Sequence, residues 1–279
     1  MRLMKAICIM AVVLCTVAVR ANALKTPEGD IPICITVNGT FIRTDAEPFI
    51  AYDTTYVPVR FVGEALGADV QWDKNTKTAA IKNSEAEIIL KENSTVAVVN
   101  GESKDMGRYA FIKDGRLFVP VRFVTETLGA AVNWDNDYFV VNIVKSGVTV
   151  PDEIKDTCSY DDITWLARII HAESSGEPSI GQVAVGNVIL NRVKSNEYPN
   201  TIYGVIFDNK FGVQFQPTVN GAIYNQPSQN CIVSAKRALK GENVVGDCLF
   251  FLNPKTSTNF WIANNRKFYT KIHNHDFYL

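Results

Sequence analysis

The chain has 279 residues, with 28 Lys and Arg against 29 Asp and Glu, and a formal net charge of −1. Hydrophobic residues make up 47% and charged residues 20%, which excludes a disordered acidic protein, a collagen and a polytopic membrane protein. The near-zero charge also argues against a dedicated nucleic-acid-binding protein, which usually has a basic excess. At about 150 residues per domain, the length favours two domains.

The first 23 residues have the pattern of a secretory signal peptide. Arg2 and Lys5 precede an apolar run over residues 6–19, and residues 21–23 read Ala-Asn-Ala, an A-x-A cleavage site. The apolar run is shorter than the about 20 residues that a membrane-spanning helix needs, although an uncleaved N-terminal anchor is the alternative. We therefore expect a secreted protein that has no membrane segment after cleavage of the signal.

Four cysteines follow the predicted cleavage site: Cys34, Cys158, Cys231 and Cys248. An exported chain permits disulfides, and four cysteines allow three pairings. No C-x-x-C spacing is present, so a structural zinc site is disfavoured. Whether a bridge forms stays open, and Cys231–Cys248 is the favoured pair because both residues lie in the second half of the chain.

A repeat with an offset of 62 residues organises the first half. The hexapeptide VPVRFV at 57–62 recurs at 119–124, and the same offset carries LGA at 66–68 to 128–130. One register holds from residue 37 to residue 143 without a gap. Each copy combines short strands, an Asn-Gly turn and a short helix closed by glycine. The pattern predicts two copies of one β-rich unit over residues 31–145.

This repeat resembles the copper amine oxidase N-terminal-like domain, or stalk domain, of exported bacterial surface proteins. The resemblance implies a spacer or a module that attaches the protein to the cell wall. The region contains no His, so it lacks the imidazole ligands that copper favours. For Arg60, Arg122, Trp72 and Trp134, packing and surface pairing are favoured, and a cationic and aromatic ligand patch is the alternative.

The pattern becomes helical in the second half, after a polar segment at 146–159 that predicts a linker. Ser159 and Asp162 form a capping box for a helix that we expect to end near Ala172. Pro178 can open the next helix, over about 179–194. That helix is apolar nearly all round, which is typical of a buried central helix.

Two carboxylates, Glu173 and Glu177, fall in the turn predicted between these helices. The negative end of the helix dipole and apolar neighbours both raise the pKa of Glu173. A carboxyl protonated near neutral pH is what a general acid for glycosidic cleavage requires. Glu177 precedes a helix N-terminus, where an ionised carboxylate is favoured, so we expect it mainly to be a cap. From the residues alone, a structural role for Glu173 is equally open.

The stretch WLARIIHAESSGEP at 165–178, continued to 193, resembles the spore cortex-lytic cell-wall hydrolase family. Further matching segments extend to the closing IHNHDF at 272–277, so the similarity covers residues 160–279. The resemblance implies a mostly helical, lysozyme-like domain that cleaves the glycan strands of peptidoglycan, with Glu173 at the position of the catalytic glutamate. The expected fold class is therefore α+β: a β-rich duplicated domain, then a mostly helical one. The expected location is the cell wall or spore envelope.

A single glutamate favours a lytic transglycosylase, which cleaves between MurNAc and GlcNAc and leaves 1,6-anhydro-muramic ends. A hydrolase with two carboxylates needs one on the opposite face of the sugar, and no matched motif supplies it. Three alternatives stay open: a muramidase acting by simple hydrolysis, an N-acetylmuramoyl-L-alanine amidase with zinc at His273 and His275, and a non-catalytic wall-binding protein. We expect no metal, no cofactor and no nucleic-acid partner.

Further side chains are expected to line the substrate groove. A loop rich in Gln and aromatic residues suits sugar stacking and recognition of hydroxyl groups. The amides of Asn187 and Asn191 on the central helix could contact N-acetyl groups or make structural hydrogen bonds, and both readings are open. His275 matches a family position and is expected to hold the groove in shape. The candidates are Glu177, Gln182, Asn191, Gln214, Phe215, Gln216, Tyr224 and His275.

Overall fold

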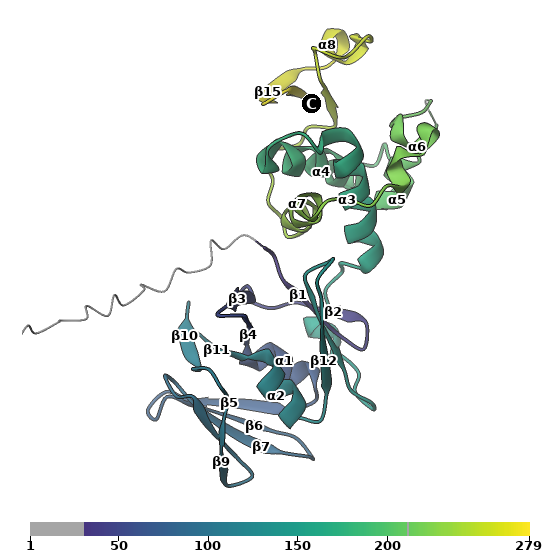
Figure 1. The fold of residues 1–279 in the computed structure, drawn as a ribbon. Coiled ribbons are helices and arrows are strands. Elements are labelled where there is room, and N and C mark those ends of the chain that lie inside the picture. Colours follow the sequence, from purple (N-terminus) through teal and green to yellow (C-terminus); the bar gives the residue numbers. More distant parts are fainter. Residues whose placement is uncertain (1–30, 211) are drawn as a thin grey trace, which may run out of the picture.

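The computed structural model describes residues 31–210 and 212–279, so the predicted signal peptide at 1–23 lies outside the described residues. It confirms the α+β class, with a β-rich domain followed by a mostly helical one (Figure 1). Within the described ranges, no helix is long and apolar enough to cross a membrane.

The first domain consists of short strands and two short helices. The helices are α1 (Val59–Ala65) and α2 (Val121–Thr127). The strands are β1 (Cys34–Val37), β2 (Thr40–Ile42), β3 (Phe49–Ala51), β4 (Thr54–Pro58), β5 (Asp69–Asp73), β6 (Thr78–Lys82), β7 (Glu87–Lys91), β8 (Val96–Val99), β9 (Glu102–Asp105), β10 (Phe111–Lys113), β11 (Arg116–Pro120), β12 (Ala131–Asp135) and β13 (Val140–Val144).

The predicted Asn-Gly turns join β1 to β2 and β8 to β9. Asn38 and Gly39 have φ of 50° and 81°, and Asn100 and Gly101 have φ of 52° and 86°. Two consecutive positive φ angles define the type I′ turn, whose twist matches that of the flanking strands. The local sequence therefore sets the register of both hairpins.

The two copies of the repeat are intertwined. Elements recur 62 residues apart, so that β1 corresponds to β8, α1 to α2 and β6 to β13. The sheets, however, run β12-β13-β1-β2, β10-β11-β4-β3 and β5-β6-β7-β8-β9. The first and the third of these sheets therefore each join the first two strands of one copy to the last two strands of the other copy. One core cluster runs through both copies, so neither copy buries its apolar face alone.

The first and the third sheets differ because only the third contains an additional strand, β7. In the first sheet, β1 pairs in parallel with β13. In the other, β7 lies between β6 and β8 and makes the sheet antiparallel throughout. The structure describes no equivalent of β7 in the second copy.

The segment at 146–159 is held against the first domain. Val150 and Ile154 are buried in its core, and the backbone N–H of Arg43 donates to the Ile154 carbonyl at 2.7 Å. These apolar side chains lie within a largely polar stretch, so composition alone did not predict their burial.

The second domain combines helices with a small sheet at the far end of the molecule (Figure 1). The helices are α3 (Tyr160–Ser174), α4 (Ser179–Lys194), α5 (Ile202–Ile206), α6 (Pro217–Asn220), the 3₁₀ turn η2 (Ala222–Tyr224), α7 (Gln229–Leu239) and α8 (Trp261–Asn265). The strands are β14 (Phe250–Leu252), β15 (Phe268–Ile272) and β16 (His275–Tyr278), in the order β14-β16-β15. The β15–β16 hairpin was not predicted from the sequence.

Helix α4 is the buried central helix, as its apolar pattern predicted. It packs between α3 and α7, and Gly186 permits the close approach. A Cβ atom at this position would lie 3.0 Å from Ile170 Cδ1 and 3.3 Å from Ala238 Cβ. The Ser159–Asp162 capping box is confirmed at the start of α3. Helix α3 ends two residues beyond the predicted end, so Glu173 lies in its last turn and not in the connecting turn.

The two domains share a buried interface. Phe41, Phe139 and Val140 of the first domain belong to the same apolar cluster as the cores of α3 and α4. Lys236 of α7 is 1% exposed, and its Nζ donates to the carbonyls of Tyr138 and Phe139 at 2.8 and 2.9 Å. A buried ammonium whose donors are satisfied by the other domain ties the two domains together.

The four cysteines are free. Cys231 belongs to the cluster that contains α3, whereas Cys248 packs with Phe277 in a separate cluster. The favoured Cys231–Cys248 pairing is therefore wrong: the two residues share a domain but pack in different parts of it.

Candidate active site

Glu173 lies half-buried in the last turn of α3. Burial raises the pKa of its carboxyl from 4.5 to about 7. No side chain or backbone group of the described residues donates a hydrogen bond to this carboxylate, so nothing compensates its lost hydration. The C-terminal end of the helix dipole acts in the same direction. A substantial fraction of Glu173 is therefore protonated near neutral pH.

Glu177 has the opposite environment. Its side chain is 7% exposed, and Oε2 accepts hydrogen bonds from His273 Nδ1 at 2.8 Å and from the backbone N–H of Asn274 at 3.3 Å. Oε1 accepts from Asn274 Nδ2 at 3.0 Å. Burial alone would raise the pKa of Glu177, but the hydrogen bonds from Asn274 and His273 outweigh it and hold this pKa below its usual value.

The predicted capping role of Glu177 is wrong. The N-cap of α4 is Pro178, and no side chain caps this helix. Glu177 instead anchors the β15–β16 turn, formed by His273 and Asn274, to the beginning of α4. Its partners are almost a hundred residues further along the chain, which explains why the local pattern indicated a cap.

His275 lies beside this anchor. The side chain is buried, and its Nδ1 lies 3.8 Å from Glu177 Oε1 without a hydrogen bond. Burial lowers the pKa of His275, against the opposing charge of Glu177. The ring meets Phe251 edge-on, with 5.5 Å between centroids. A neutral, packed imidazole is consistent with the expected shaping role.

The two predicted amide ligands are engaged within the protein. Gln182 donates to the Glu177 carbonyl at 3.1 Å and accepts from Ser234 Oγ at 3.0 Å. Asn191 donates to the carbonyls of Gly246 and Cys248 at 2.7 and 3.0 Å. Asn187 donates to the Glu242 carbonyl at 2.6 Å, so the structure supports structural hydrogen bonding for Asn187 and Asn191, of the two readings left open.

Of the four candidates at 214–224, one is buried in the core and three are partly or fully exposed. Phe215 is 4% exposed and packs in the core beneath the Arg192 guanidinium, so it is not a surface substrate contact. Gln214 is partly exposed and donates to the Gly212 carbonyl. Gln216 and Tyr224 are exposed and remain available to a ligand.

An aromatic group on α3 was missed as a candidate. Trp165 lies 5.1 Å from Tyr203 and 6.2 Å from Tyr224, measured between ring centroids, and Arg168 stacks on its ring at 5.0 Å. Tyr203 and Tyr224 are both exposed. The partners come from three separate segments, so helical periodicity could not assemble them. Helix α3 thus carries both Glu173 and the half-buried Trp165, against which two exposed tyrosines of other segments pack.

No group of three or more His, Cys, Asp or Glu side chains that could hold a metal ion occurs within 31–210 and 212–279. The candidate site is therefore one protonatable carboxyl beside a hydrogen-bonded anchor.

Comparison with known proteins gives two family matches. A copper amine oxidase N-terminal domain model matches residues 36–143, and a cell wall hydrolase model matches residues 176–278. The cell wall hydrolase CwlJ of Oceanobacillus iheyensis is 31% identical over 100 residues, which cover 34% of this chain and 70% of that protein. The chain belongs to the cell wall hydrolase family. Both resemblances seen in the sequence are confirmed.

Other relatives are more similar in sequence, but the match covers less than half of their length. A spore cortex-lytic enzyme of Bacillus cereus is 41% identical over 104 residues, and that of Bacillus subtilis is 38% identical over the same length. The match covers 37% of this chain and 39% and 33% of these two relatives, respectively. The catalytic domain of the germination-specific lytic transglycosylase SleB from Bacillus anthracis is 38% identical, with 47% of this chain and all of that chain covered and a TM-score of 0.41.

The matched family segment begins at residue 176, three residues after Glu173. It contains Glu177 and the β15–β16 hairpin. The case for Glu173 therefore depends on its environment in the fold, not on the family match.

Proposed function

We propose that this protein cleaves the glycan strand of peptidoglycan between MurNAc and GlcNAc, as a lytic transglycosylase with Glu173 as its acid–base residue. The observation that carries the proposal is the half-buried carboxyl of Glu173, whose pKa is raised to about 7 and which accepts no hydrogen bond from the described residues. Such a group holds a transferable proton at neutral pH, as a glycosidic general acid must. Membership of the cell wall hydrolase family supports the substrate class.

The reaction needs one carboxyl in two successive roles. Glu173 donates its proton to the oxygen that links MurNAc C1 to GlcNAc, and the C1–O bond breaks. The resulting carboxylate then accepts the proton of the muramic 6-hydroxyl while that oxygen attacks C1. The products are a GlcNAc end with a free hydroxyl and a 1,6-anhydro-muramic end, and Glu173 regains its proton. No water is consumed.

The environment of Glu177 favours this route over hydrolysis. A two-carboxylate hydrolase needs its second carboxylate free to act on the opposite face of the sugar. Glu177 instead accepts hydrogen bonds from His273 and Asn274 through both oxygens. It is therefore engaged as a structural anchor.

We further propose that the protein is exported, acts on the spore cortex or another peptidoglycan layer, and contacts the wall through its first domain. The names of its spore cortex-lytic relatives and the stalk-like repeat support this part of the proposal.

Mass spectrometry of peptidoglycan digested by the purified protein tests the reaction. We expect 1,6-anhydro-muramic ends, which weigh one water less than the reducing ends left by a muramidase. Reducing muramic ends would replace the transglycosylase with a hydrolase, and released stem peptides would indicate an amidase. No new ends at all would indicate a non-catalytic wall-binding protein.

A further inference from the structure

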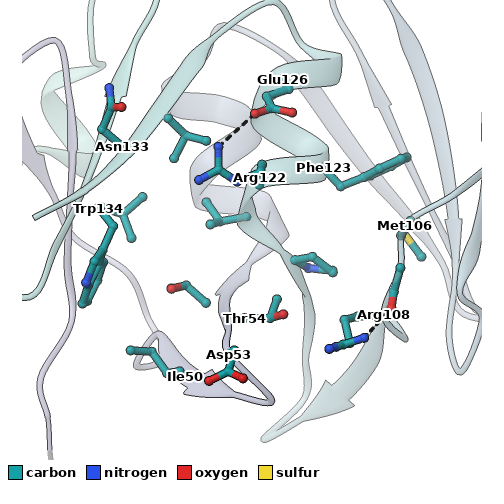
Figure 2. Close-up of a pocket in the computed structure, with 16 residues that line it drawn as sticks. Ile50, Asp53, Thr54, Met106, Arg108, Arg122, Phe123, Glu126, Asn133 and Trp134 are labelled. Atoms are coloured by element: carbon teal, nitrogen blue, oxygen red, sulfur yellow. Dashed lines mark hydrogen bonds and ion pairs between the residues drawn. The ribbon is translucent and has the colours of Figure 1, made fainter. Parts of the chain in front are cut away.

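The first domain contains a cleft of about 660 Å³ that the proposed catalysis does not use. Small-molecule sites typically measure about 300–1,000 Å³. The β3–β4 hairpin, the loop after β9, the beginning of α2 and strands β12 and β13 surround it (Figure 2). The side chains on which the argument depends are Trp134, Thr54, Arg108 and Arg122.

The lining combines an aromatic ring with balanced polar groups. Trp134 on β12 is 36% exposed, next to Asn133. Arg122 and Glu126 form an exposed ion pair at 3.1 Å on one wall (Figure 2). Two arginines and two carboxylates line the cleft in all, so it offers no net positive charge to a polyanion. An exposed indole with hydroxyl and paired charged groups suits a neutral, hydroxyl-rich ligand.

The repeat shows that the residues bordering this cleft differ from their counterparts in the other copy. In the 62-residue register, Thr54 corresponds to Arg116, and Gly107 corresponds to Asp45. Arg116 and Asp45 form an ion pair that ties β11 to the segment before β3. Thr54 and Gly107 both line the cleft and cannot form that pair. The two copies therefore differ at the residues that border the cleft.

The tip of the β3–β4 hairpin, which lies beside the cleft, also differs between the two copies of the repeat. Its turn residues, Tyr52 and Asp53, have φ of 52° and 56°, and the equivalent turn in the second copy is Asp114-Gly115. Asp-Gly is a favoured pair for this turn, whereas a bulky residue with positive φ is uncommon. Tyr52 is nevertheless present and exposed, and Arg108 of the cleft donates to its carbonyl at 3.3 Å.

We propose that this cleft is a second glycan-binding site, in which Trp134 stacks on a sugar ring while Thr54 and Arg108 hydrogen-bond to its hydroxyl and acetamido groups. The proposal rests on peptidoglycan being the substrate and specifies how the first domain contacts it. Asp135, directly after Trp134, accepts a hydrogen bond from the Tyr160 hydroxyl at the start of α3. The wall of the cleft is thus connected to the helix that carries Glu173.

Binding without turnover tests the cleft. The full chain carrying Glu173→Gln is co-sedimented with insoluble peptidoglycan, and peptide-free glycan strands or free stem peptides are added as competitors. Trp134→Ala should raise the half-saturating concentration by about tenfold or more, as loss of an aromatic anchor does. The matched control is Trp72→Ala, because Trp72 is the repeat equivalent on β5 and is 37% exposed. This control should bind like the parent.

Thr54→Arg is the second variant, since it introduces the residue of the other copy without removing a core ring. It should weaken binding as Trp134→Ala does. If both variants bind as tightly as Trp72→Ala, the cleft is not a glycan site. If stem peptides compete and glycan strands do not, the glycan assignment is wrong. The proposed catalysis is judged separately, from the ends that the wild-type protein produces, because this binding assay requires no turnover.

Discussion

Glu173 and Glu177 are four residues apart and have opposite protonation behaviour. Burial without a hydrogen-bond partner raises the pKa of Glu173, and hydrogen bonds that outweigh burial lower the pKa of Glu177. Two neighbouring carboxyl groups, one with a raised pKa and one with a lowered pKa, are typical of sites in which one group transfers protons and the other stays ionised.

Replacing the proposed proton donor should nearly abolish activity. Glu173→Gln keeps the shape of the side chain but has no transferable proton, so the rate on purified peptidoglycan should fall by about 10²–10⁴-fold. Initial rates of turbidity loss measure this. Glu197→Gln, at an exposed position, is the control and should retain the wild-type rate. Near-normal activity of Glu173→Gln would remove Glu173 from the mechanism.

The raised pKa of Glu173 predicts two pH trends for the wild type, one in activity and one in stability. Activity of the wild type should fall as pH rises through about 7, because the general acid loses its proton. The folded pKa lies above the unfolded one, so the folded state binds more protons, and wild-type stability should decrease between pH 4.5 and about 7.

Glu173→Gln lacks this titration and should be more stable than wild type above pH 7, by about 1–2 kcal/mol after allowance for the solvent access of a half-buried group. Urea unfolding at pH 5 and pH 8 measures the difference. An equal stability of the two proteins at both pH values would contradict the raised pKa.

At the scale of elements, the site depends on one helix end and one distant hairpin. Helix α3 presents Glu173 in its last turn, and the β15–β16 turn is fastened to the beginning of α4 by Glu177. The short connection between α3 and α4 therefore lies under direct tertiary restraint.

Loosening this hairpin should lower stability in a pH-dependent way. Asn274→Ala removes donors from the buried Glu177 carboxylate, which should cost about 1–3 kcal/mol at pH 7. The pKa of Glu177 is lowered in the fold, so its stabilisation is present above its unfolded pKa and is lost as pH falls through the folded value. The difference from wild type should therefore shrink in acid. Asn265→Ala on α8, an exposed asparagine, is the control. A constant difference down to pH 3 would mean that the carboxylate is not the cause.

At the scale of the whole molecule, the two domains are joined by more than a chain connection. An apolar cluster crosses the boundary, and buried Lys236 donates into the backbone of the first domain. Burial disfavours the charged form of Lys236 and so lowers its pKa. The two carbonyl acceptors offset part of the cost of burying this charge.

Removing this cation should uncouple the domains. Lys236→Met removes the donor to the Tyr138 carbonyl and one of the two donors to the Phe139 carbonyl, which keeps the backbone N–H of Cys34, so stability should fall by about 1–3 kcal/mol. Calorimetry should show one transition for the wild type and a broadened or split transition for the variant. Lys267→Met, at an exposed position, should behave like wild type. A single, unshifted transition for Lys236→Met would show that the interface does not couple the domains.

The sequence alone determined what depends on residues close together in the chain: the two family resemblances, the repeat register, the Asn-Gly turns, the capping box and the direction of the Glu173 pKa. These features follow from local conformation and from helix ends. The tertiary structure decided the intertwining of the two copies, the burial of Phe215, the role of Glu177 and the open cleft. Each of these depends on partners far apart in the chain, such as Glu177 and His273 with a separation of 96 residues. No periodicity records such contacts, because they form only when separate elements pack together.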